Sequence, residues 1–306
     1  MEIREHVPLA RYTTFEIGGN ARWYVEVTTT EEIVEALLWA RDNNVRFYII
    51  AGGSNLLIAD EGLPGIVIRI AAGMFGITST TLEAAAGCNL LDLIRLSASE
   101  GLSGWEKMAG IPGSIGGAVR GNAGAFGTEI KNVLTWAQAI NIDTLEQHEF
   151  SDAECGFGYR TSYFKLHPQW IITRVHLSLG QGDALATERL IEETIAEREK
   201  RHIQNVRAAG SYFLNPAASL DVVAQFEKEK GTTSRENRVP AGWLIEKAGM
   251  KGKKLGGVQS SPQQANYLVN IGDATASDVR ALADLIKTAV REQFNIELQE
   301  EAVILK

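Results

Sequence analysis

The sequence predicts a mixed α and β protein (α+β), and three features of its 306 residues lead to that prediction. Strand-like apolar runs alternate with a helical pattern over the first 70 residues, and the last third repeats this alternation. Between them, from about residue 77, short strand patterns surround a single helix. The length allows two domains of ordinary size or one large domain. The 45% hydrophobic and 22% charged composition is that of a globular protein.

The first 70 residues are predicted to form a β-α-β unit. Thr29 and Glu32 have the spacing of a helix capping box, and the apolar residues that follow lie on one helical face. Those apolar residues are Ile33, Ala36, Leu37 and Ala40. Strand-like runs follow at 45–50 and 65–70. We therefore expect this segment to be the first part of a larger domain.

The rest of the chain continues the mixed pattern. Strands are predicted at 81–86, 134–142 and 170–177, with one helix at 90–99. A polar helix at about 187–201 separates the two patterned halves and indicates a domain boundary. The clearest helix of the last third is predicted to have Leu282, Leu285, Ile286 and Ala289 on one face. A strand-like run at 296–305 ends the chain.

Charge and cysteine content exclude several classes of protein. A net charge of −8 and a pI near 5.3, with no block of Lys or Arg, disfavour nucleic acid as a partner. Two cysteines, Cys88 and Cys155, without a CxxC motif indicate a reducing compartment. The histidines have no metal-ligand spacing, so no metal is expected; they are His6, His148, His167, His176 and His202. With no signal-peptide pattern and no apolar run of about 18 residues, we expect a cytoplasmic protein without a membrane partner.

Two glycine-rich segments are candidate ligand-binding loops. The first is 52–55, at the end of a strand-like run, and the second is 110–118, followed by 122–127. Glycine lets the backbone approach a ligand closely and adopt positive φ, so successive N–H groups can converge on an anion. Neither segment fits the GxGxxG fingerprint or a P-loop. The pair favours a bulky phosphorylated ligand such as a dinucleotide cofactor, and tight turns alone are the alternative.

Three polar segments are candidates for chemistry, each with a structural alternative. Arg160 either clamps a carboxylate through its planar fork or is solvated. Ser211, after Gly210, either presents a fixed hydroxyl or caps a turn, and no GxSxG elbow indicates an esterase-type nucleophile. In the expected C-terminal strand, Glu300 and Glu301 alternate, so that one faces solvent and the other a cleft. Alternatively, both are only solubilising.

Taken in order, these segments resemble those of the UDP-N-acetylenolpyruvoylglucosamine reductase (MurB) family of bacterial peptidoglycan synthesis. The resemblance covers essentially the whole chain, and the loop lengths are similar to those of its shorter, type II form. The segments that carry it are 13–19, 52–55, 110–117, 122–125, 159–160, 210–211 with 215–216, 265–270, and the acidic C-terminal run.

The resemblance implies a specific fold and cofactor. The fold is an FAD-binding core of two α/β subdomains, of the vanillyl-alcohol-oxidase (PCMH) type, plus a C-terminal α/β substrate-binding domain. The implied boundaries are 1–70 for subdomain 1, with the final strand 297–306 returning to it, 71–200 for subdomain 2, and 201–296 for the substrate domain. The implied FAD-binding residues are Gly52, Gly53, Ser54, Asn55, Gly110, Ile111, Pro112, Gly113, Ser114, Gly116, Gly117, Ala118, Asn122 and Gly124.

The implied activity is that of UDP-N-acetylmuramate dehydrogenase. NADPH reduces FAD, and hydride then passes to the enolpyruvyl ether of a UDP-sugar, UDP-N-acetylglucosamine enolpyruvate. By resemblance, Arg160 and Glu301 stabilise the enolate-like charge, and Ser211 donates the proton to carbon. Tyr159 and Asn215 are the implied substrate contacts. A monomer is expected.

The chain departs from the family pattern at three places. Leu214 stands where Lys is usual before Asn-Pro; either that positive charge is missing, or Lys247, Lys251 or Lys253 supplies it. The C-terminal motif has Glu300 where Pro is usual, and Gln264 stands where His is common. All three implied catalytic residues are present, so activity is expected. A related flavin oxidase and a binding protein that has lost catalysis are the alternatives.

Overall fold

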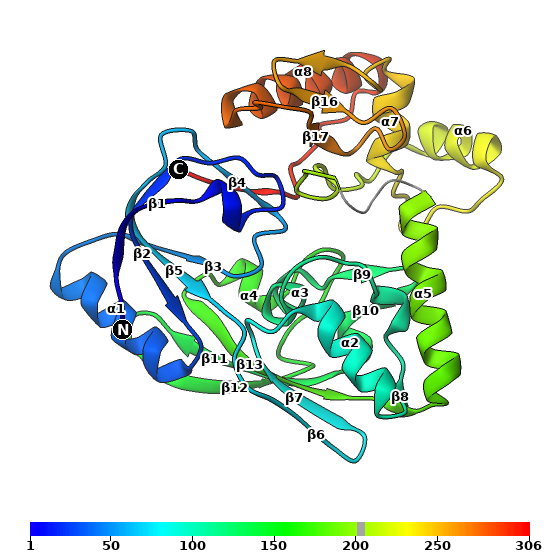
Figure 1. Ribbon diagram of the computed structural model, residues 1–306. Coiled ribbons are helices and arrows are strands. Elements are labelled where there is room, and N and C mark those ends of the chain that lie inside the picture. The colour runs from blue at the N-terminus through cyan, green and yellow to red at the C-terminus, as the bar shows by residue number, and fades with distance from the viewer. Residues whose placement is uncertain (201–205) are drawn as a thin grey trace. The chain divides into compact units, whose positions relative to one another are not determined.

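The computed structural model describes residues 1–200 and 206–306, whose helices and strands are shown in Figure 1. Contacts divide the chain into two compact units, each made of segments distant in sequence. The first unit comprises Met1–Val7, Ala21–Gly53 and Pro64–Lys200. The second comprises Pro8–Asn20, Ser54–Leu63 and Arg201–Lys306.

The first unit begins with a small sheet in the strand order β1-β2-β5-β3. Its strands are β1 (Arg4–Pro8), β2 (Asn20–Val27), β3 (Phe47–Ile50) and β5 (Leu63–Ile70), with β3 and β5 parallel. Helix α1 (Thr30–Asp42) has the predicted capping box, with Thr29 Oγ1 accepting from the Glu32 N–H at 3.2 Å. All four apolar residues predicted for its inner face are buried among residues of β2 and β5. The helix prediction is confirmed.

A five-stranded antiparallel sheet, in the order β12-β11-β13-β7-β6, forms the rest of the first unit. Its strands are β6 (Phe75–Thr78), β7 (Thr81–Ala85), β11 (Leu134–Asn141), β12 (Gln147–Ser151) and β13 (Trp170–Ser178). Alternate residues such as Leu82 and Ala84 are buried, as the two-residue period of a strand requires. Helix α3 (Ile115–Gly121) packs against β7 and β13, and α2 (Leu90–Ser99) packs against α5 (Ala184–Lys200) (Figure 1).

Shorter elements complete the first unit. They are α4 (Tyr163–Leu166) and the antiparallel pairs β8 (Leu102–Ser103) with β14 (Gly180–Gln181) and β9 (Gly124–Ala125) with β10 (Thr128–Glu129).

The second unit has one apolar core, built mainly around helix α8 (Ala276–Phe294). The other elements are α6 (Leu220–Lys230), α7 (Ala241–Lys247) and the antiparallel strands β15 (Lys254–Leu255), β16 (Val258–Ser260) and β17 (Leu268–Asn270). Strand β4 (Leu56–Ile58) pairs in parallel with β18 (Val303–Leu305). Phe15, Ile17 and Leu57 are buried in the same core, so N-terminal residues complete the C-terminal unit.

Two details of the C-terminal prediction were wrong. Leu285 is 44% exposed, although α8 does bury Leu282 and Ile286. Because the buried stripe also includes Val279 and Val290, Leu285 lies more than 100° from its centre at about 100° per residue. The run 296–305 is a strand only over Val303–Leu305, although Glu300 forms an isolated bridge with Phe213.

The predicted polar helix is present as α5 and is described up to Lys200; residue 201 of the prediction, like His202, lies outside the described residues. Among the described residues, no helix combines the length and the apolar character needed to cross a membrane.

Candidate active site

The two predicted glycine loops meet in the first unit. A Cβ atom on Gly52 would lie only 2.6 Å from Gly113 Cα and 2.8 Å from the Ser114 nitrogen, so the two backbones touch. Gly53 and Gly113 have φ values of 65° and 115°, which L-residues with side chains rarely adopt. Glycine at position 52 therefore lets the two loops pack backbone against backbone, which fixes one loop against the other.

The second loop is held by hydrogen bonds to a neighbouring segment. The N–H groups of Ile115 and Gly116 donate to the carbonyls of Cys88 and Ala86 at 2.9 and 2.8 Å. Ser114 caps α3, its Oγ accepting from the Gly117 N–H at 3.2 Å. A Cβ on Gly116 would lie 2.6 Å from Ala86 Cβ, so this glycine permits close packing of α3. The loop therefore has a rigid inner side.

Arg160 lies against the end of the same glycine-rich region. Its Nη2 donates to the Gly124 carbonyl at 3.1 Å and its Nη1 to the Asn122 carbonyl at 3.5 Å. Its φ is 52°, and Lys165 Nζ donates to its carbonyl at 2.8 Å. A non-glycine residue at positive φ is strained, and such strain is concentrated at functional sites. Arg160 and the predicted loop residues Asn122 and Gly124 thus form one cluster.

Asn122 is fully buried at the centre of that cluster. Its Nδ2 donates to Glu129 Oε2 at 3.0 Å and to the Gly158 carbonyl at 2.9 Å. Both partners are acceptors, which fixes the orientation of the amide group. Its Oδ1 is buried without a hydrogen-bond partner among the described residues. A buried acceptor of this kind is costly unless a water or a ligand donor satisfies it.

In the second unit, Ser211 lies on a segment held from two sides. Gly210 before it has φ 73°. On one side Asn266 receives the Phe213 N–H on its Oδ1 at 2.9 Å and donates its Nδ2 to the Phe213 carbonyl at 2.8 Å. On the other side the C-terminal segment supplies two backbone bonds, Glu301 N–H to the Tyr212 carbonyl at 2.8 Å and Leu214 N–H to the Gln299 carbonyl at 2.9 Å. The fold thus brings the Ser211 segment and Glu301 together.

Glu300 and Glu301 have different partners. The Glu300 carboxylate pairs with Lys287 of α8. The Glu301 carbonyl accepts from Asn55 Nδ2 at 3.0 Å, so part of the first glycine loop holds the C-terminal segment.

Burial, and then the charges of Glu300 and Asp284, raise the pKa of Tyr212, whose hydroxyl is buried and has no hydrogen-bond partner among the described residues.

The two predicted substrate-contacting residues, Tyr159 and Asn215, also contact other residues of the protein. Tyr159 lies beneath the guanidinium of Arg160, 5.6 Å from ring centroid to Cζ. Asn215 Oδ1 accepts from the Ala241 N–H at 3.0 Å and so caps α7. Of the lysines proposed to replace the charge missing at Leu214, Lys247 pairs with Glu229 at 2.8 Å and Lys251 with Glu246 at 3.0 Å. Lys253 is exposed.

Sequence reasoning missed Asn266 and Glu129 as parts of the site. Asn266 lies in the run 265–270, and Glu129 lies two residues after Gly127. An Asn buried within an apolar run was the one signal for Asn266, because a buried amide must find backbone partners. Glu129 had no signal, since its role depends on a hairpin that brings it to Asn122.

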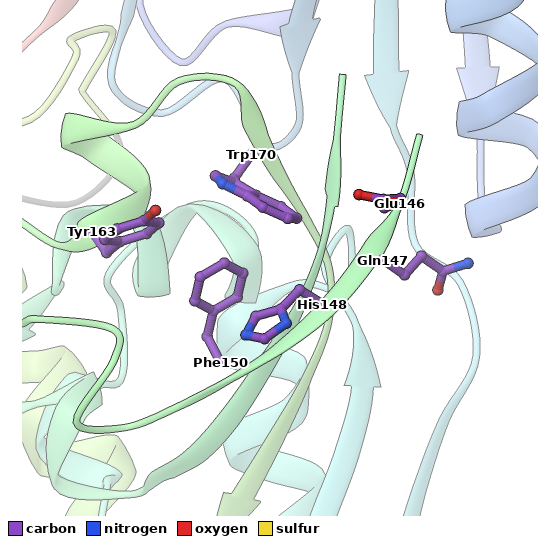
Figure 2. A pocket seen from close by; sticks show the side chains of 6 residues that line it. All are labelled: Glu146, Gln147, His148, Phe150, Tyr163 and Trp170. Carbon is purple, nitrogen blue, oxygen red and sulfur yellow. The ribbon is translucent and has the colours of Figure 1, made fainter. Parts of the chain in front are cut away.

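A shallow pocket of about 530 Å³ lies elsewhere on the first unit, and none of the predicted site residues lines it. Figure 2 shows Phe150, His148 and Trp170 close together, with Glu146 and Gln147 farther along the segment that carries His148 and Phe150. Phe150 packs edge-to-face on His148 and Trp170, with ring centroids 4.5 and 5.0 Å apart. Because the rings pack against one another, we interpret the pocket as the edge of a structural aromatic cluster. Among the described residues, no group of three or more His, Cys, Asp and Glu side chains has the geometry to hold a metal ion.

The residues of the first unit fit a flavin dinucleotide. Gly52 and Gly117 are exposed and carry no side chain, the exposed Pro112 lies in the same loop as Gly117, and the Asn122 Oδ1 is a buried acceptor without a partner among the described residues. No lysine is required, because backbone N–H groups can face an anion in a chain of negative net charge.

Comparison with known proteins agrees with this fit. The model of the FAD binding domain family matches residues 21–145, so the class is an FAD-binding oxidoreductase. The model of the UDP-N-acetylenolpyruvoylglucosamine reductase C-terminal domain matches residues 201–305. UDP-N-acetylenolpyruvoylglucosamine reductase of Solibacter usitatus is 34% identical, with 98% of this chain and 96% of the relative covered, and that of a Synechococcus strain is 36% identical, with 99% and 91% covered.

A solved structure gives the same result for the fold. The crystal structure of UDP-N-acetylenolpyruvylglucosamine reductase (MurB) from Thermus caldophilus has a TM-score of 0.77 and 32% identity, covering 100% of this chain and 98% of that one. The chain belongs to the UDP-N-acetylenolpyruvoylglucosamine reductase family. Its fold class, with an FAD-binding core and a C-terminal α/β domain, is the one predicted from the sequence. FAD is its cofactor.

Proposed function

We propose that this protein catalyses the NADPH-dependent, FAD-mediated reduction of UDP-N-acetylglucosamine enolpyruvate to UDP-N-acetylmuramate, a step of peptidoglycan precursor synthesis. The observation that carries the proposal is the backbone pairing within the second unit, where the Glu301 N–H donates to the Tyr212 carbonyl at 2.8 Å, next to Ser211. The proposed proton donor, Ser211, and the Glu301 carboxyl group thereby lie on neighbouring segments that are hydrogen-bonded to each other. Family membership supports the identity of the reaction.

Bound FAD supplies the two-electron relay between the reductant and the enol ether. Adding hydride to the terminal carbon of the enol ether leaves carbanion character on the neighbouring carbon, delocalised into the carboxylate. Arg160 provides the positive charge that stabilises this group. Its guanidinium rests on the carbonyls of Asn122 and Gly124, which orient it and carry no formal charge.

Ser211 then donates its hydroxyl proton to that carbon, and Glu301 stabilises the developing charge as a hydrogen-bond donor in its protonated form. A serine hydroxyl is a weak acid, so the donation depends on the strong basicity of the carbanion and on a fixed position. Asn266 on one side and the C-terminal segment on the other restrict the Ser211 backbone and supply that fixed position.

The remaining assignments complete the proposal. The glycine loops at 52–55 and 110–118, with Asn122 and Gly124, hold FAD, and residues 201–296 form the substrate-binding domain. Tyr159 and Asn215 contact the UDP-sugar. We expect a monomer that works in the cytoplasm, and the two free thiols are consistent with a reducing compartment.

The test is an anaerobic absorbance experiment on the purified protein reconstituted with FAD. NADPH is expected to bleach the flavin band, and the enolpyruvyl UDP-sugar is expected to restore it. A flavin that bleaches and does not recover would favour the related oxidase or the inactive binder. No flavin binding at all would contradict the assignment of the glycine loops.

A further inference from the structure

The cluster around Arg160 contains an acidic residue with no role in the mechanism above. Glu129 ends the hairpin formed by β9 and β10, where it lies directly opposite Gly124. A Cβ on Gly124 would lie 2.7 Å from Glu129 Cγ, so the glycine allows the Glu129 side chain to pass close to the backbone of β9. The side chain is 29% exposed.

The Glu129 carboxylate is hydrogen-bonded to Asn122, the residue whose carbonyl is one of the two that accept from the arginine. Its Oε2 accepts from Asn122 Nδ2 at 3.0 Å and from Lys131 Nζ at 2.8 Å. Arg160 Nη1 donates to the carbonyl of Asn122, and Arg160 Nη2 donates to the carbonyl of Gly124. Gly124 is the residue opposite Glu129 in the hairpin. Asn122 Nδ2 also donates to the Gly158 carbonyl, two residues before Arg160. Glu129 Oε2 thus anchors the side-chain amide of Asn122, which links the end of α3 to the segment before Arg160.

This anchoring is needed because the local backbone is strained. Asn122 and Arg160 have φ values of 42° and 52°, and the hairpin turn residues Phe126 and Gly127 are also at positive φ. Strained backbone persists only where surrounding contacts over-determine it. The Asn122 amide, both of whose hydrogens are donated to acceptors, ties the α3 terminus to the Arg160 loop, together with the hydroxyl of Ser162, which donates to the Arg120 carbonyl at 2.7 Å.

We infer that Glu129 is a positioning residue for Arg160: through the Asn122 side chain it holds the segment 122–124, whose carbonyls orient the guanidinium toward the substrate carboxylate. The inference rests on the proposed function, because it assigns to Glu129 a role in the substrate half-reaction. It assigns no role in reduction of the flavin by NADPH. In this role, the length of the Glu129 side chain and its ability to accept a hydrogen bond from Asn122 are decisive, and its negative charge is secondary.

The experiment compares Glu129→Ala, Glu129→Gln and Glu129→Asp with wild type, in both half-reactions, with rates expressed per bound flavin. The Gln substitution keeps an oxygen for Asn122 at the same reach, whereas the Asp substitution shortens the side chain by one methylene and the Ala substitution removes the acceptor. We expect flavin reduction by NADPH within about twofold of wild type in all three. Reoxidation by the enolpyruvyl UDP-sugar is expected to fall about 100-fold in Glu129→Ala and about 10-fold in Glu129→Asp, and by less than about threefold in Glu129→Gln.

A double-mutant cycle with Arg160→Ala separates positioning from an independent effect. If Glu129 acts through Arg160, Glu129→Ala has no further effect on reoxidation once Arg160 is absent. Additive losses would overturn the inference, as would equal slowing of both half-reactions or reoxidation of Glu129→Ala at the wild-type rate. Should Glu129→Ala fail to fold, the order of the other two decides, and a slower Glu129→Gln than Glu129→Asp contradicts the inference.

The matched control is Glu83→Gln, which removes the charge of a surface glutamate on β7 of the same unit, paired with Arg174 at 2.6 Å. It is expected to leave both half-reactions unchanged. The failure of the proposed function would look different, since wild-type flavin itself would then not be reoxidised by the UDP-sugar.

Discussion

At the scale of single residues, Ser211 is the sharpest test of the mechanism. Ser211→Ala removes the proton donor and leaves the backbone bonds around it in place. We expect flavin reduction by NADPH to be unchanged and reoxidation by substrate to slow by about 10²–10⁴-fold, the usual contribution of a positioned proton donor. Stopped-flow absorbance measures both half-reactions. Equal loss in both would contradict the assignment.

The adjacent glutamates give a second prediction at the same scale. Glu301→Gln replaces the carboxylic O–H donor with a weaker amide N–H donor, so substrate reduction is expected to fall by about 100-fold or more. Glu300→Gln keeps an oxygen that accepts from Lys287, and a loss below about tenfold is expected. Steady-state rates at saturating substrate compare the two variants. The reverse order would show that the register of the catalytic carboxylate is shifted by one residue.

At the scale of elements, the Asp278 carboxylate forms half of the capping box at the start of α8. Thr275 Oγ1 accepts from the Asp278 N–H at 3.0 Å, and Asp278 Oδ2 accepts from the Thr275 and Gly257 N–H groups at 3.2 and 3.3 Å. The Thr275 backbone bond, and then the Gly257 bond, outweigh the effect of burial and lower the pKa of Asp278. The charged form therefore stabilises the folded state.

Asp278→Ala is expected to lower the free energy of unfolding at pH 7 by about 1 kcal/mol. Because the folded pKa lies below the unfolded one, the charge contributes fully above pH 4 or so, and its contribution is lost as pH falls through the folded pKa. Urea unfolding at pH 7 and pH 3 measures the difference between variant and wild type. Glu292→Ala, on the exposed side of the same helix, is the control and should change stability by less than about 0.5 kcal/mol at either pH.

At the scale of the whole molecule, the second unit is not a contiguous domain. Phe15, Ile17 and Leu57 are 0 to 2% exposed within its core, and Asp60 accepts from the N–H groups of Ala276 and Ser277 at the start of α8. Burial of three such side chains contributes roughly 5–9 kcal/mol, comparable with the 5–15 kcal/mol stability of a whole domain. We expect residues 206–306 alone to show no cooperative urea transition by circular dichroism. A cooperative transition with full helix content would contradict this.

The thiols give a second prediction for the molecule as a whole. Cys88 and Cys155 are 3% and 0% exposed, and burial raises the pKa of both. Burial, with the nearby charges of Asp152 and Glu154, raises the pKa of Cys155 to about 12. Only the thiolate reacts, so we expect no rapid reaction with a disulfide reagent at pH 8 and two reactive thiols after denaturation. A rapidly reacting thiol in the native protein would contradict the burial of one of these residues.

The local elements of this protein were predictable because their causes are local. The capping box at Thr29, the apolar face of α1 and the bounds of α2 follow from residues within one or two helical turns. The exposed Leu285 was missed because a helical face is defined by what packs against it, and the core that selects Val279 and Val290 is assembled from distant segments.

The sequence by itself determined the residue types of the site and, through the resemblance they carry, the family and its cofactor. Tertiary structure decided what those residues contact. Gly52 meets Gly113, Arg160 rests on two carbonyls, and the Ser211 segment pairs with residues 299–301, across about 60 residues in the first case and nearly 90 in the last. Such contacts depend on the closure of long loops and on buried polar groups finding partners, which no local pattern encodes. For the same reason only the fold reveals Glu129, and the one sequence signal for Asn266 is its place in an apolar run.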